Sequence, residues 1–167
     1  MMESLQDSIL EYKKQMEKGI IQKAYQGIMD FILQLRTHFK NKYPEYSVPG
    51  NIYCGYMDMT YFPLFPQTLK SRKLKIAIVF IHDTCRFEVW LSGYNRQVQQ
   101  KYWELIKENN WNKYRIVPNA KVADSVIEST LVENPDFNDL DALTKKIETS
   151  TLNFIQDVEA FLARHDN

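Results

Sequence analysis

Two neighbouring segments, residues 73–81 and 86–92, constrain the fold of this chain more than any other feature. Both are rich in β-branched and aromatic residues, which favour strands, and Asp83-Thr84 between them suits a two-residue turn. Such a turn pairs residues whose numbers add up to 167. The pairing predicts an antiparallel hairpin with one fully apolar face, made of Leu74, Ile76, Ile78, Phe80, Phe87, Val89 and Leu91.

The opposite face of this hairpin mixes charged and apolar side chains. We call it the mixed face; it holds Lys75, Ala77, Val79, Ile81, Arg86, Glu88, Trp90 and Ser92. Charged side chains are costly to bury without partners, so we expect a helix to cover part of this face and the rest to stay open.

Apolar spacing along the rest of the chain predicts the other elements. Helical periodicity predicts two helices before residue 44, one from about residue 95 to 109 and one after Asn138, its expected N-cap. Strands are expected at residues 51–62, ending at Pro63, at 114–117 and, favoured over a helix by β-branched residues, at 124–132. The order ααβββαββα predicts an α+β fold, with a mainly antiparallel sheet of about five strands packed by helices.

Composition predicts one soluble globular domain over residues 1–167. Hydrophobic residues make up 44% of the chain and charged residues 25%, which are ordinary proportions for such a domain. No apolar stretch follows Met1, and the longest apolar run, residues 76–81, is too short to cross a bilayer. We therefore expect a cytoplasmic protein that is not bound to a membrane, with Cys54 and Cys85 as free thiols.

The charges sum to zero but are unevenly distributed. Residues 70–121 hold eleven basic and four acidic residues, whereas residues 122–167 hold three basic and ten acidic ones. Either the acidic end packs near the basic middle and the two fields cancel, or Lys70, Arg72, Lys73 and Lys75 form a basic face for an anionic partner. The first interpretation is favoured, because nucleic-acid-binding modules are usually basic overall, and nucleic acid is not the expected partner.

Asp58 is the only charged residue between Glu45 and Lys70. Its neighbours are aromatic and sulfur-containing, and an ionised carboxylate is costly to desolvate there without a partner. Asp58 is therefore a structural anchor, a surface residue or part of a site. The register of the hairpin suggests Glu88, Arg86 and Lys75 as its neighbours.

Two kinds of site are compatible with these residues. The first is a ligand-binding site formed by Asp58, Glu88, Trp90, Arg86, Asn95 and Arg96, in which the last two begin a helix and could offer backbone N–H groups to an anion. The second is a metal-dependent, nuclease-like hydrolase in which Asp58 and Glu88 hold a divalent cation such as magnesium and Lys75 positions water.

The second alternative rests on a layout similar to that of restriction-endonuclease-type nucleases, and the chain departs from it at one position. Trp90 stands where that pattern has its lysine, so Lys75 would have to act from another strand. His82, Asp83 and Cys85 could supply ligands or a thiol, but they suit a turn better, and no metal site is predicted. No phosphate loop or dinucleotide glycine fingerprint is present.

Three stretches carry a resemblance to a known family: residues 55–62, 73–80 and 87–95. With Lys101-Tyr102-Trp103 and the residues around Pro135, they make the chain similar to a family of small uncharacterised bacterial cytoplasmic proteins, a domain of unknown function. The resemblance implies a stand-alone bacterial domain and assigns no activity. The biochemical function is open; the sequence favours a non-enzymatic ligand-binding or protein-interaction module, which could form a homodimer, over an enzyme.

Overall fold

A computed structural model describes residues 3–166 of the chain. The chain divides into two compact units, residues 1–35 and residues 36–167. The first unit contains helix α1 (Leu5–Glu17) and the larger part of α2 (Ile20–Lys42), whose last turns belong to the second unit. The single domain expected from the composition stays a prediction.

The start of α1 follows directly from its sequence. Ser4 Oγ accepts a hydrogen bond from Asp7 N at 3.1 Å, while Asp7 Oδ2 accepts one from Ser4 N at 3.2 Å. This reciprocal capping box satisfies two backbone donors that a helix leaves open at its beginning. The helix is closed at Gly19, whose φ of 70° lies in the left-handed region that favours glycine. None of the α1 residues is buried.

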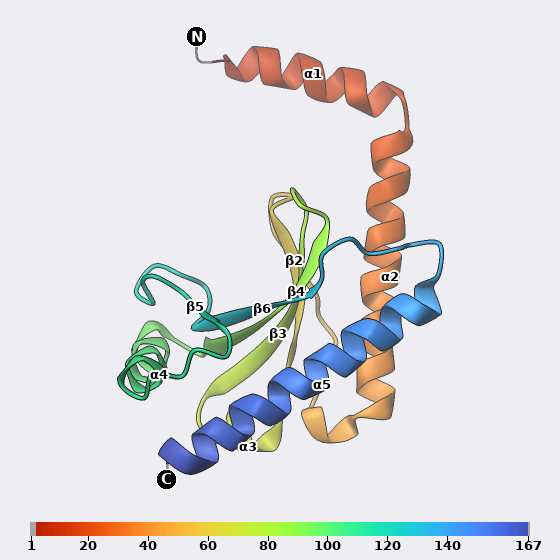
Figure 1. The fold of residues 1–167 in the computed structure, drawn as a ribbon. Helices are drawn as coiled ribbons and strands as arrows, with labels where there is room; N and C mark the ends of the chain where they lie inside the picture. The colour runs from red at the N-terminus through yellow and green to blue at the C-terminus, as the bar shows by residue number, and fades with distance from the viewer. Residues whose placement is uncertain (1–2, 167) are drawn as a thin grey trace. The chain divides into compact units, whose positions relative to one another are not determined.

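The second unit is built on one six-stranded sheet (Figure 1). Its strands are β1 (Tyr53–Cys54), β2 (Met59–Leu64), β3 (Leu74–Ile81), β4 (Arg86–Gly93), β5 (Arg115–Ile116) and β6 (Ile127–Val132), in the order β1-β2-β3-β4-β6-β5. Every neighbouring pair is antiparallel. The helical elements are the end of α2, η1 (Pro44–Tyr46), α3 (Gln67–Lys70), α4 (Arg96–Glu108) and α5 (Leu140–His165). The α+β prediction is confirmed, with six strands instead of about five.

The predicted hairpin is present in the predicted register. The pairs run from Leu74 opposite Gly93 to Ile81 opposite Arg86, so each pair of numbers adds up to 167. All seven residues of the apolar face are at least 98% buried. Helix α5 runs across the sheet (Figure 1) and packs against β4 and β6. It buries an apolar stripe that includes Ile147, Phe154 and Val158. The hairpin and α5 therefore form the core of the second unit.

The expected strand over residues 51–62 is wrong in detail. The chain turns at residues 55–58, so this segment forms two paired strands, with Tyr53 opposite Tyr61. Strand β2 also continues through Pro63, which lies opposite Ala77. On the side away from β3, β1 pairs only as far as Tyr61 and leaves Pro63 at an open edge, where proline is tolerated. The last helix is capped by Asp139, whose side chain accepts from Ala142 N, instead of by Asn138.

A buried carboxylate links the end of α2 to α5. Glu148, 7% exposed, accepts hydrogen bonds from Lys42 Nζ at 2.6 Å, from His38 Nε2 at 2.8 Å and from the Tyr43 hydroxyl. Burial raises the pKa of Glu148, but the hydrogen bonds from Lys42, Tyr43 and His38 together outweigh it and lower that pKa to about 2. Burial, together with the Glu148 carboxylate, raises the pKa of Tyr43 to about 12. This carboxylate is thus held in its charged form.

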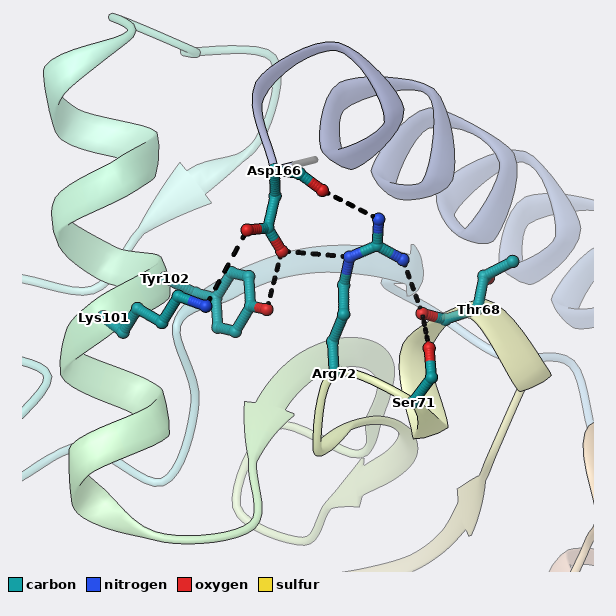
Figure 2. A network of polar contacts seen from close by, with 6 residues as sticks. All are labelled: Thr68, Ser71, Arg72, Lys101, Tyr102 and Asp166. Atoms are coloured by element: carbon teal, nitrogen blue, oxygen red, sulfur yellow. Dashed lines mark hydrogen bonds and ion pairs between the residues drawn. The ribbon is translucent and has the colours of Figure 1, made fainter.

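A second polar network holds the end of α5 (Figure 2). Asp166 Oδ2 accepts from Arg72 Nε at 3.0 Å and from the Tyr102 hydroxyl at 2.8 Å, and Lys101 Nζ lies 3.7 Å from Oδ1. Arg72 also donates to the main-chain oxygens of Asp166 and Thr68. The network therefore joins α3, α4 and the end of α5.

Ion pairs connect the basic middle of the chain to its acidic end. Besides the two cations on Asp166, Lys113 lies 3.0 Å from Asp157, and Arg115 pairs with Glu128. This pairing supports the interpretation in which the two fields cancel. Cys54 and Cys85 are free thiols, and none of the helices within residues 3–166 is long and apolar enough to pass through a bilayer.

Candidate ligand-binding pocket

A hollow of about 610 Å³ lies on the mixed face of the sheet, entirely within the second unit. We call it the main pocket. Its lining comes from the β1–β2 hairpin, the centre of β3 and β4, the start of α4 and the loop before β6: Tyr53, Asp58, Met59, Tyr61, Lys75, Ala77, Trp90, Ser92, Gly93, Tyr94, Asn95, Arg96, Gln99 and Asp124.

Strand register brings the floor of the main pocket together. Ala77 lies opposite Trp90, and Lys75 lies opposite Ser92, so all four side chains project from the same face. Tyr61 on β2 pairs with Val79 and projects on that face as well. The floor is therefore a direct consequence of the hairpin register that the sequence predicts.

Aromatic rings form the walls. Tyr53 and Tyr61 stack with ring centroids 4.9 Å apart, and Trp90 and Tyr94 add two more rings to the lining. The Lys75 ammonium lies 5.5 Å from the centroid of the Tyr61 ring, within the range of a cation–π contact. Stacked rings of this kind offer flat apolar surfaces to a ligand.

Lys75 is the half-buried cation of the main pocket. Burial lowers the pKa of Lys75, and the negative charge of Asp124 opposes this effect only in part. Burial and the Asp124 charge also raise the pKa of Tyr61. Within residues 3–166, no carboxylate lies within ion-pair distance of Lys75. Its charge is therefore partly desolvated without being neutralised.

The start of α4 forms the rim. Asn95 Oδ1 accepts from Val98 N at 2.9 Å and so caps the helix that the sequence predicts from about residue 95, and Arg96 lies 3.8 Å from Asp124. Gln99 holds this end of the helix against the sheet, because it accepts from Gly93 N at 3.0 Å and donates to the Ala123 carbonyl at 2.7 Å. A β-carbon on Gly93 would lie 2.7 Å from Gln99 N, so only glycine fits there.

Asp58 lies in the β1–β2 turn instead of inside a strand, and it is exposed. Its carboxylate lies close to the backbone of Gly55, where an added β-carbon would be only 2.0 Å from Asp58 Oδ1. Met57 adopts a left-handed φ of 62° in this turn. The Asp58 carbonyl accepts a hydrogen bond from His82 N at 3.0 Å, which joins the turn to the residue that follows β3. Asp58 is thus a surface residue on the main pocket.

Glu88 and Arg86 lie outside the main pocket. Glu88, 4% exposed, accepts from Arg86 Nε at 2.5 Å and from Trp90 Nε1 at 2.9 Å, so its carboxylate is already satisfied. Both residues line a second hollow of about 370 Å³, together with Lys113, Tyr114, Arg115, Glu128, Ser129 and Thr130. Trp90, which lines the main pocket, donates this hydrogen bond to Glu88, which lines the second hollow.

The six residues of the expected ligand site are therefore divided between the two hollows. Four of them line the main pocket: Asp58, Trp90, Asn95 and Arg96. Lys75, which is not among the six residues of the expected ligand site, lines the main pocket as well. That alternative would need Asp58 and Glu88 to act from different hollows, and it stays a prediction. Residues 3–166 contain no group of three or more His, Cys, Asp or Glu side chains placed to hold a metal ion.

Several lining residues are not found by reading the sequence. Tyr53 and Tyr61 belong to a conspicuously aromatic stretch, but their stacking depends on the hairpin that the sequence does not predict. Ser92 could have been found, because the predicted register places it opposite Lys75. Asp124 carries no such signal, since it reaches the main pocket from a loop that is distant in the sequence.

Comparison with known proteins identifies a family and no characterised relative. No curated protein and no solved structure matches the chain. A family model described as "Domain of unknown function (DUF7000)" matches residues 5–162, which include every residue that lines the main pocket. The chain therefore belongs to this family of unknown function, in agreement with the resemblance carried by its strands.

Proposed function

We propose that this protein is a ligand-binding module, and that the main pocket takes a small molecule with a flat ring and an anionic group. The observation that carries the proposal is Lys75, a half-buried ammonium with no carboxylate partner among residues 3–166. A desolvated charge without a partner is unfavourable, and an anionic ligand would supply the missing partner.

The walls of the main pocket suit the ring of such a ligand. Tyr53, Tyr61 and Trp90 present aromatic surface beside Lys75, so a flat group could stack while its anionic substituent reaches the ammonium. Pockets that bind small molecules commonly combine apolar walls with a few polar groups that fix the orientation of the ligand.

The charge balance of the lining argues for a small ligand over a polyanion. Lys75 and Arg96 are opposed by Asp58 and Asp124, so the lining has no net positive charge. A nucleic acid requires several cations along its backbone, and acidic groups at the same surface would repel it. A ligand with a single anionic group avoids this repulsion.

Benzoate is a suitable first probe, because it consists of one flat ring and one carboxylate. We expect a Kd of about 1 mM, as befits so small a ligand, measured by calorimetry and by a rise in melting temperature. Lys75→Met should weaken binding by about tenfold, because it removes the charge-assisted contact.

Lys121→Met is the matched control. Lys121 is exposed and lies outside the lining of the main pocket, so this variant makes the same charge change and should bind benzoate as the wild type does. Equal benzoate affinity in wild type and Lys75→Met, or no benzoate binding at all, would contradict the proposal.

A further inference from the structure

Two opposite charges on the main pocket lack partners. The Lys75 ammonium and the Asp58 carboxylate both belong to its lining. Within residues 3–166, neither group lies within ion-pair distance of an opposite charge, and they do not pair with each other. The main pocket therefore presents a separated positive and negative group.

The other charged groups at this surface offset these two charges only in part. Arg96 and Asp124 face each other at 3.8 Å, and Arg96 also donates to the Ala123 carbonyl. His82 is the titratable group near Asp58; its Nε2 lies 2.9 Å from Thr60 Oγ1, and burial lowers its pKa, which the Asp58 charge opposes only in part. Among residues 3–166, no cation therefore lies within ion-pair distance of the Asp58 carboxylate.

We infer that the ligand of the main pocket is a zwitterion: a flat ring with a carboxylate at one end and an ammonium at the other. The carboxylate pairs with Lys75, the ammonium pairs with Asp58, and the ring between them lies on the tyrosine surface of Tyr53 and Tyr61. This inference rests on the proposed function and adds the second charge of the ligand. It turns Asp58, the lone charge of an aromatic segment, into a specificity-determining residue.

The test compares one zwitterion with its two halves on the wild-type protein. The probes are 4-(aminomethyl)benzoate, which carries both charges at opposite ends of one ring, benzoate and benzylamine. We expect 4-(aminomethyl)benzoate to bind about tenfold more tightly than benzoate at pH 7, because it gains a second charge-assisted contact. Because this comparison needs no variant, it does not depend on the folding of any mutant.

Variants then locate the second contact. Asp58→Asn should abolish the advantage of 4-(aminomethyl)benzoate over benzoate, because it removes the partner of the ammonium. Asp83→Asn, an exposed acid in the neighbouring turn and outside the main pocket, is the matched control and should change neither affinity.

The outcomes separate this inference from the proposed function. Equal affinities for benzoate and 4-(aminomethyl)benzoate overturn the zwitterion and leave the anion site standing. An advantage of the zwitterion that persists in Asp58→Asn also overturns the inference, because another group then holds the ammonium. If none of the three probes binds, the proposed function falls together with the inference.

Discussion

Replacement of Glu148 by glutamine tests how the end of α2 is attached to α5. Glutamine keeps the shape of the side chain but removes the charge that Lys42, His38 and Tyr43 stabilise. The carboxyl pKa falls from an ordinary value of 4.5 to about 2, and each unit corresponds to about 1.4 kcal/mol. Loss of the charge should therefore lower the free energy of unfolding by about 3 kcal/mol at pH 7.

The pH dependence of this difference has a definite sign. A carboxyl group whose pKa is lowered by folding contributes stability above its unfolded pKa, and loses it as the pH falls toward its folded pKa. The gap between wild type and Glu148→Gln should therefore be constant above pH 5 and should close between about pH 4.5 and pH 2. Urea unfolding followed by circular dichroism at several pH values measures both proteins.

Glu133→Gln is the matched control for this experiment. Glu133 is exposed, so the same chemical change should alter the free energy of unfolding by less than about 0.5 kcal/mol. The reasoning is refuted if Glu148→Gln is as stable as the wild type at pH 7, or if the gap between them stays constant down to pH 2.

Three further outcomes follow from features described above. Asp166→Ala should lower the free energy of unfolding by about 1–3 kcal/mol in urea titrations, because it leaves the buried Tyr102 hydroxyl and Arg72 without their acceptor; stability equal to wild type would contradict this. Gly93→Ala should cost about 1–3 kcal/mol through its clash with the α4 backbone. By contrast, Gly27→Ala, inside α2 with nothing within 4 Å of its added β-carbon, should raise the free energy of unfolding by about 0.5–1 kcal/mol. The steric argument would be refuted if Gly93→Ala were more stable than Gly27→Ala. Millimolar magnesium should leave the melting temperature unchanged, and a rise that Asp58→Asn abolishes would favour the metal-dependent alternative.

The sequence predicts the central hairpin well because the signal is local. Strand-favouring residues on both sides of a short turn determine both the register and the face of each side chain. The same reasoning places Lys75 and Trp90 near one another, and both line the main pocket. Where strand and turn chemistry agree, the face of the sheet on which a side chain lies can be predicted to the residue.

The neighbourhood of Asp58 could not be predicted in the same way. Alternation tells which face a side chain occupies, but it does not detect a turn that is held by a left-handed Met57 and a close approach at Gly55. The sequence therefore treats Asp58 as part of a strand and suggests Glu88 as a neighbour. In the structure Trp90 and Arg86 already satisfy Glu88, because side chains two residues apart on one strand share a face.

Both outer strands of the sheet are only two residues long. An exposed sheet edge offers unpaired N–H and C=O groups on which a further strand can assemble, and this is a common route to aggregation. Here β1 and β5 present short edges, and beside β1 the longer β2 carries Pro63, which has no N–H to offer. The β1 edge of the sheet is therefore a poor template on which a strand of another molecule could assemble.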